Sequence, residues 1–439
     1  MDVTLAVDPS DLDRRDLDRR IAGLAIPALG SIAAEPLYSL ADTAIVGHLG
    51  RNPLDTLAVA TSALSIVAWL AIFLSTATTT EVSRNTARGA PRQAGRAVGA
   101  AYCVAAGWGV VTAVVVVAVA PLLVSLLGAH AQIAGAATTY IRISAAGLPF
   151  LYLSYVGNGH VTGLANTRTP LRIAIFANAV NVALEALLVF GLHWGLAGSA
   201  WGTVVAQLLA AIAYWSASLR AAVPPVPPGR ADIGAVLRDG HRLSVRTIAL
   251  GVVPLGATAV AARLGPVPLA GQQVANRVWT LLSLSLDALA VPAQVYVSTA
   301  LGAGDRAAAR LAARRTLVLG LACGCGLAVA TAGLAFVAPP AFTGDPAVRH
   351  AATIGLLWAA LTQPLAALAY VYDGIILGLG DYAAMRRAMI IAILAFAPIA
   401  ALVLRFHWLG LGGVWAALGC WLALRSVLLG RHWARAGAG

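Results

Sequence analysis

The chain has 439 residues, of which 59% are hydrophobic and only 11% are charged, and its formal net charge is +12. Soluble domains carry about 25% charged residues, so this composition excludes an ordinary soluble protein and predicts segments that lie inside a bilayer. All the basic residues other than histidines are arginines. Arginines that flank apolar segments set membrane orientation, so we do not interpret the positive charge as a nucleic-acid site.

Apolar segments long enough to span a bilayer recur along the whole chain. A membrane-spanning helix needs about 20 predominantly apolar residues. Between arginines and turn residues the sequence predicts twelve such helices, at 20–47, 54–84, 97–128, 131–163, 170–191, 196–219, 236–263, 267–301, 311–338, 350–378, 388–404 and 409–430. The predicted fold class is therefore an all-α polytopic membrane protein.

One stretch, 220–235, interrupts this series. It contains the sequence VPPVPPGR, whose prolines cannot continue a helix. We therefore predict that it is a linker between an N-terminal lobe of six helices at 20–219 and a C-terminal lobe of six helices at 236–430. The tails of the chain are expected at 1–19 and 431–439.

The arginines alternate between the two sides of the predicted bundle. If the N-terminus is cytoplasmic, the outer loops contain only Arg51, Arg263, Arg349 and Arg405, and the other loop arginines lie on the inner side. Cytoplasmic loops carry an excess of arginine and lysine. We therefore predict that both termini and the linker 220–235 are cytoplasmic, in a bacterial-type inner membrane.

The two lobes repeat one another in sequence. HWGLAGSAW at His193–Trp201 matches HWLGLGGVW at His407–Trp415, and VTGLANT at Val161–Thr167 matches ILGLGDY at Ile376–Tyr382, with an offset of 214 to 215 residues. Because each lobe has six helices, an even number, both lobes insert in the same direction and form a parallel repeat. Such repeats build transporters whose binding cavity lies between the halves.

Acidic side chains inside the spans mark candidate functional positions, because a charge in the bilayer costs about 2.5–3.5 kcal/mol even on insertion scales. Tyr38 and Asp42 share one face of the first helix, and Asn181 and Glu185 share one face of the fifth. With Thr203 of the sixth helix, these side chains lie at similar distances from the outer ends of their spans. The pattern predicts a polar cluster inside the N-terminal lobe.

Two chemical roles fit this cluster. Burial makes a carboxylic acid hold its proton more tightly, and a neighbouring carboxylate strengthens the effect, so Asp42 and Glu185 form a candidate proton site. With the neutral oxygens of Asn181 and Thr203, the same carboxylates form a candidate sodium site, since hard cations prefer oxygen ligands. Both ions remain candidates, and no other metal site is expected.

The C-terminal lobe lacks this cluster but carries Asp287 and Asp373 inside its spans. Asp373 matches Asn158 in the repeat, so this position is polar in both lobes. We predict that these residues, together with Tyr38 and Asn178 of the N-terminal lobe, face a substrate cavity. Hydrogen bonding between packed helices is the alternative role of the two aspartates.

Long stretches of the chain carry a recognisable pattern: LAIPALGSIAAEPLYSLADTAIVGHLG at Leu24–Gly50, YIRISAAGLPF at Tyr140–Phe150, GLANTRTPL at Gly163–Leu171, NAVNVALEALLVFGL at Asn178–Leu192, GLAGSAWGTVVAQ at Gly195–Gln207 and VYDGIILGLGD at Val371–Asp381. This pattern resembles the multidrug and toxic compound extrusion (MATE) family, specifically its DNA-damage-inducible protein F branch. The resemblance covers nearly the whole chain.

The resemblance implies twelve helices in two six-helix lobes and gradient-driven export of organic compounds. By motif position, it implies an ion-coupling site at Asp42, Asn181, Glu185 and Thr203. It also implies that Tyr140 and Asn158 are polar positions near this site, where we expect both to face the substrate cavity, and that Pro27 is a hinge of the first helix. The family usually has aspartate where this chain has Glu185, so the geometry of ion binding is expected to differ.

We therefore predict a secondary active exporter that exchanges organic compounds for H+ or Na+ by alternating access. Its substrates are expected to be small and cationic or amphipathic, and the protein is expected to act as a monomer in the lipid bilayer. We expect no enzymatic activity, no cofactor and no nucleic-acid partner. The alternative is a flippase for lipid-linked precursors from the same fold superfamily, although that class usually has extra helices and a cationic cavity.

Overall fold

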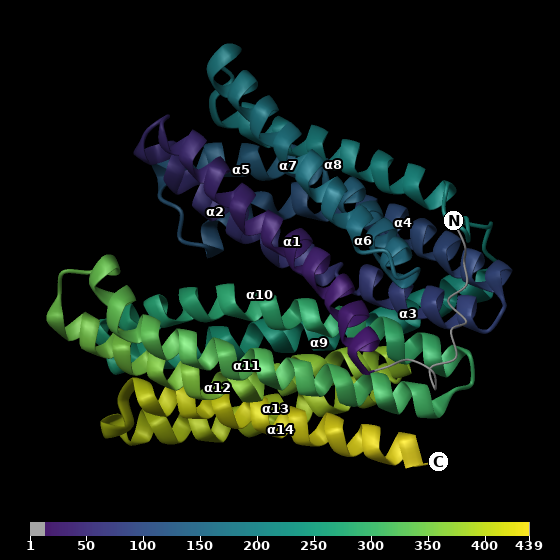
Figure 1. Cartoon of the computed structure of the whole chain (residues 1–439). Helices are drawn as coiled ribbons and strands as arrows, with labels where there is room; N and C mark the ends of the chain where they lie inside the picture. Colours follow the sequence, from purple (N-terminus) through teal and green to yellow (C-terminus); the bar gives the residue numbers. More distant parts are fainter. Residues whose placement is uncertain (1–13, 439) are drawn as a thin grey trace. The chain divides into compact units, whose positions relative to one another are not determined.

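The computed structural model describes residues 14–438, and the regular elements among them are all helical (Figure 1). In chain order they are α1 (Arg14–Gly47), α2 (Arg51–Leu70), α3 (Phe73–Ala87), α4 (Pro91–Leu126), α5 (Ala131–Ala145), α6 (Leu148–Gly163), α7 (Arg168–Ala186), the π-helical turn η1 (Leu187–Gly191), α8 (Gly195–Leu219), α9 (Arg230–Leu264), α10 (Pro266–Gly302), α11 (Arg306–Phe342), α12 (Pro346–Leu379), α13 (Tyr382–Arg405), the 3-10 turn η2 (His407–Leu409) and α14 (Gly410–Ala438). The predicted all-α class is confirmed.

The helices also account for the predicted number of membrane crossings. Within residues 14–438, 11 helical segments are long and apolar enough to span a membrane, and α2 with α3 counts as one of them. The predicted span 131–163 is divided at Gly147 into α5 and α6, each too short to be counted alone. With this pair, the twelve crossings are confirmed. Gln207 of α8 packs against the break, because a Cβ at Gly147 would lie 1.9 Å from its Oε1 atom.

The end of α7 is irregular. Asn181 and Glu185 lie in its last turns, and the helix passes directly into η1. Leu192 donates its backbone N–H to the carbonyl oxygen of Leu187, five residues earlier, at 2.9 Å. Such π-helical turns are rare and occur frequently at functional sites, so this irregularity supports the choice of Glu185 as a candidate residue.

The chain forms two compact units. The described part of the first contains residues 26–240, and that of the second contains residues 14–25 and 241–438. The first unit therefore includes most of α1 and the beginning of α9, whereas the second includes the first turns of α1 and the rest of α9.

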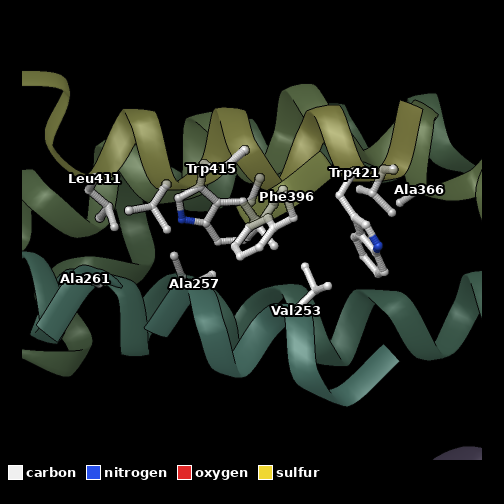
Figure 2. Packing of buried hydrophobic residues seen from close by; sticks show 14 of the residues in the cluster. Val253, Ala257, Ala261, Ala366, Phe396, Leu411, Trp415 and Trp421 are labelled. Atoms are coloured by element: carbon white, nitrogen blue, oxygen red, sulfur yellow. The ribbon is translucent and has the colours of Figure 1, made fainter. Parts of the chain in front are cut away.

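Each unit buries its own apolar core. In the first unit, Leu57, Val116 and Ile141 belong to a core formed largely by α2, α4 and α5. Figure 2 shows the core of the second unit, where Trp415 of α14 and Phe396 of α13 lie against α9. These cores give both units the packing that positions their polar side chains.

The internal repeat is visible in two close helix contacts. A Cβ at Gly159 of α6 would lie 2.3 Å from the backbone oxygen of Ser75 of α3, and a Cβ at Gly374 of α12 would lie 2.3 Å from the backbone oxygen of Ala290 of α10. Gly374 lies 215 positions after Gly159, and Ala290 lies 215 positions after Ser75. Small residues allow membrane helices to approach closely. The same glycine therefore makes the same helix crossing in each unit, and the predicted parallel repeat is confirmed.

Candidate functional site

The two carboxyl groups predicted to form a cluster lie together inside the first unit. Asp42 is in the last third of α1, and Glu185 is at the end of α7. Asp42 is 5% exposed and Glu185 is fully buried. Asp42 lies within electrostatic reach of Glu185. Two like charges at a buried site repel each other, so the doubly ionised state is unfavourable without a compensating cation.

One oxygen of Asp42 is held by a hydroxyl group. Ser199 of α8 donates its Oγ–H to Asp42 Oδ1 at 3.0 Å. The hydroxyl of Tyr140, a buried residue of α5, lies 3.5 Å from Ser199 Oγ. Ser199 therefore positions the Asp42 carboxylate. The sequence did not single out this serine, because serines in apolar helices commonly bond to their own backbone.

Glu185 has no comparable partner. Both of its carboxylate oxygens are buried and make no hydrogen bond of regular geometry among residues 14–438, although Asp42 and the Ser199 hydroxyl lie close enough to interact with them. Asn181 Oδ1 likewise has no partner among these residues. Leaving a buried polar group unsatisfied costs about 1–3 kcal/mol. These atoms are acceptors when the carboxylate is ionised. A proton on Glu185 or a cation among these oxygens would therefore remove the cost.

Thr203 is engaged by its neighbours. The Tyr38 hydroxyl lies 3.1 Å from Thr203 Oγ1, and Thr203 donates its own hydroxyl proton to the backbone oxygen of Ser199 at 3.2 Å. A hydroxyl group has a single proton, so the oxygen of Thr203 accepts the bond from Tyr38. The bond from Tyr38 ties α1 to α8, and the bond to Ser199 lies within α8.

The other polar residues predicted for the first unit make helix contacts. Asn178 donates its side-chain N–H to the backbone oxygen of Ala34 at 2.8 Å, which joins α7 to α1. Asn158 accepts a hydrogen bond from Thr162 within α6 at 3.1 Å. Asn178 thus fixes the register between the two helices that carry Glu185 and Asp42.

In the second unit, Asp373 is fully buried and bound to two arginines. Arg246 of α9 donates Nε–H to Asp373 Oδ2 at 3.0 Å. Arg425 of α14 donates Nε–H to Asp373 Oδ1 at 3.1 Å and also donates from Nη2 to Oδ2. The side chains of Arg425 and Asp373 are both inaccessible to solvent. This carboxylate is saturated with charged donors and joins α9, α12 and α14.

Asp287 completes the charge balance of this group. It is half-buried on α10 and interacts electrostatically with Arg246, Arg425 and Asp373. With both aspartates ionised, the cluster contains two positive and two negative charges. The sequence did not reveal these arginines as partners of an acid, because arginines near the ends of apolar spans are interpreted as orientation signals. Arg246 is instead a helical residue of α9 that is 8% exposed.

Pro27 lies within the continuous helix α1. Proline removes one backbone hydrogen bond of a helix, so α1 is weakened at this position. The first unit begins at Ile26, which places Pro27 directly beside the point where the chain enters that unit. Among residues 14–438, no group of three or more His, Cys, Asp or Glu side chains could hold a metal ion.

Comparison with known proteins places these features in context. The MatE family model matches residues 27–187 and 247–405. Protein DETOXIFICATION 44, chloroplastic, from Arabidopsis thaliana is 31% identical over 422 residues, which cover 93% of this chain and 80% of that protein. DNA damage-inducible protein F of Escherichia coli (strain K12) is 26% identical over 430 residues, which cover 95% of this chain and 92% of that protein. The Probable multidrug resistance protein NorM of Thermotoga maritima is 22% identical over 437 residues, which cover 94% of this chain and 91% of that protein.

Solved structures show the same fold. A MOP superfamily transporter from Pyrococcus furiosus matches with a TM-score of 0.88 and 18% identity over 100% of both chains. A MATE protein in its straight conformation matches with a TM-score of 0.88 and 19% identity, also over 100% of both chains. At this level of identity the likeness concerns the fold.

Proposed function

The chain belongs to the MatE family of membrane transporters, and on this premise we propose that it exports small organic compounds in exchange for a cation by alternating access. Family membership makes it a multi-pass transporter and not an enzyme. Export of toxic compounds is supported by relatives that are named as multidrug resistance proteins. We propose cationic or amphipathic substrates, because the buried carboxyl groups Asp42 and Glu185 have no ion pair with a basic side chain among residues 14–438.

The observation that carries the proposal is the state of Glu185. Among residues 14–438 its two buried oxygens make no hydrogen bond of regular geometry, and the groups that interact with them are the acid Asp42 and the hydroxyl of Ser199. Such a pair gains stability when it binds one positive charge and loses it when that charge leaves. A ligand can drive a conformational change only through different affinities for the two states. The pair thus provides a binding energy that an ion gradient can couple to export.

We propose a proton as the coupling ion, with sodium as the alternative. Thr203, one of the predicted sodium ligands, already accepts from Tyr38 and donates to Ser199. Asp42 accepts from Ser199. A proton needs no coordination shell, and it satisfies the Glu185 carboxyl without displacing any of these bonds. Sodium would have to coordinate Thr203 through the single lone pair that these two bonds leave free.

A reconstituted system tests the function and the ion together. The protein is placed in liposomes, and a pH gradient or a sodium gradient is imposed separately while transport of the cationic dye ethidium is recorded. We expect the pH gradient alone to drive transport. Transport driven only by sodium would reject the proton, and absence of transport with either gradient would reject ion-coupled export of such compounds.

We also propose that both termini and the connection between α8 and α9 face the cytoplasm of an inner membrane, because the arginines concentrate on that side. Gly229 is exposed in this connection. A cysteine placed there should resist a membrane-impermeant maleimide added to intact cells, and it should react after the cells are opened. Rapid labelling from outside would reverse the topology.

A further inference from the structure

The segment 221–229, which connects α8 to α9, lies directly on the first unit. Val226 donates its backbone N–H to the carbonyl oxygen of Gly95 in α4 at 2.9 Å. A Cβ at Gly95 would lie 2.5 Å from the backbone oxygen of Pro224, and a Cβ at Gly99 would lie 2.1 Å from that of Val226. Helix α4 therefore presents two glycines to the segment, and no larger residue leaves room for its backbone.

A buried histidine joins the same segment to three helices. His160 of α6 is fully buried. Its Nε2 atom lies 2.9 Å from the backbone oxygen of Val223, and its Nδ1 atom lies 2.9 Å from Ser218 Oγ of α8. The hydroxyl of Tyr102 in α4 lies 2.9 Å from the same Ser218 oxygen. One continuous chain of hydrogen bonds thus runs from α4 through α8 and α6 to the connecting segment.

The direction of these bonds follows from the groups involved. A carbonyl oxygen only accepts, so Nε2 carries the proton that it donates to Val223. In the neutral imidazole Nδ1 then accepts from the Ser218 hydroxyl, and the Ser218 oxygen accepts from Tyr102. Every donor in this series of hydrogen bonds therefore has an acceptor. Removal of His160 would leave both Ser218 and Val223 without this partner.

The matched position in the second unit shows that helix packing alone does not require a histidine. His160 corresponds to Ile375 in the repeat, at an offset of 215 residues. Ile375 is fully buried in an apolar cluster with Val371 and Val297. The same site in the fold therefore accepts an aliphatic side chain. In the first unit the histidine serves a polar neighbour, the connecting segment.

We propose that His160 is a positioning residue that clamps the segment 221–229 to the first unit, so that the segment moves as part of that unit. The first unit continues to Gly240 of α9, where a Cβ would lie 2.5 Å from the ring of Phe73. The connection is thus fixed as far as this residue. For transport, which rests on the proposed function, the consequence is that flexure occurs within α9 near Gly240 and His241.

Hydrogen exchange of the full-length protein in detergent or nanodiscs tests the clamp without any transport assay. The prolines of the segment have no amide proton, which makes the amide of Val226 a clear reporter. We expect this amide to be protected in the wild type. The variant His160→Leu should raise its exchange rate by about tenfold, the effect of losing one hydrogen bond worth about 1.4 kcal/mol. Exchange of Val226 at the unprotected rate in the wild type would overturn the proposal.

Three further variants make the test specific. His160→Gln keeps a donor and an acceptor and should retain most of the protection, whereas Ser218→Ala should raise exchange moderately without removing a large side chain. Ile375→Leu, at the matched position, should leave Val226 unchanged. Unchanged exchange in both His160→Leu and Ser218→Ala would show that the histidine is not the clamp.

Ethidium transport by the same proteins separates the clamp from the proposed function. Asp42→Asn should lose transport but keep the protection of Val226. His160→Leu should lose the protection, and its transport should be slower than that of the wild type. Loss of protection with an unaltered transport rate would overturn the role of the clamp in transport, whereas a wild type without transport would reject the proposed function and leave the exchange result standing.

Discussion

The two units place carboxyl groups at buried positions in opposite electrostatic settings. In the first unit, Glu185 makes no hydrogen bond of regular geometry among the described residues and faces a second acid, Asp42. In the second unit, Asp373 is bound by Arg246 and Arg425. A carboxylate with two guanidinium partners is already compensated, whereas a pair of acids needs a cation from outside. The comparison teaches that burial alone does not identify a coupling residue, because the charge of its neighbours decides whether an ion can bind and leave.

The largest expected effect is that of Asp42→Asn on transport. Asparagine keeps the volume and accepts the bond from Ser199 but cannot titrate. We expect ethidium transport to fall to the level of empty liposomes, while the unfolding free energy changes by less than about 1 kcal/mol, because no paired charge is lost. Dye flux and thermal unfolding measure the two effects. Normal gradient-driven transport by a folded variant would remove Asp42 from the coupling site.

Asp373→Asn should instead lower the stability of the fold strongly. Breaking a buried ion pair leaves an uncompensated charge and costs about 3–5 kcal/mol, so we expect a large loss of stability in chemical or thermal unfolding. Asp287→Asn serves as the control in the same cluster and should cost less, because Asp287 is half-buried. Equal stability of wild type and Asp373→Asn would contradict the structural role that we assign to the second cluster.

Glu185→Gln should change the pH dependence of transport. Two interacting carboxyl groups release their protons in steps that belong to the pair. With glutamine, the pair becomes a single titrating group, and the pH profile should lose the contribution of the second group. The measurement is the rate of ethidium transport across a series of pH values. A profile identical to that of the wild type would show that Glu185 takes no part in coupling.

Glu185→Asp should have the smallest effect. The shorter side chain keeps a titratable carboxyl at the position where the resembling family usually has aspartate. We expect transport to persist and to respond to the same gradient as in the wild type. Complete inactivity of this variant, with intact folding, would mean that the length of the Glu185 side chain is essential to the site.

The sequence revealed the parts of this comparison that depend on residue type within apolar spans. Asp42 and Glu185 stood out because a charged residue is rare in such surroundings, and the helical spacing placed them near Asn181 and Tyr38. The repeat was visible because the matching motifs keep a constant offset. The spans were also visible. The division at Gly147 was not predicted, although Pro149 at the start of α6 is a local signal for it, because proline has no N–H to continue the preceding helix.

The partners of these acids were beyond the sequence for physical reasons. Ser199 is one of many hydroxyl residues in apolar helices, and only the packing of α1 against α8 shows that it bonds to Asp42. Arg246 and Arg425 lie toward the ends of their apolar spans, where an arginine is expected to set membrane orientation. The contact of His160 with Val223 joins a helix to a proline-rich connection, and no periodic pattern predicts such a contact.

The most direct test of the central claim is the release of protons when substrate binds to the purified protein in weakly buffered detergent solution. Our account predicts that ethidium displaces about one proton per wild-type protein, since an acid pair that shares a single proton has one to give up. Glu185→Gln and Asp42→Asn should release none, and Asp287→Asn should behave as the wild type. Undiminished release from both first-unit variants, or a loss confined to Asp287→Asn, would contradict the account and place coupling in the second unit.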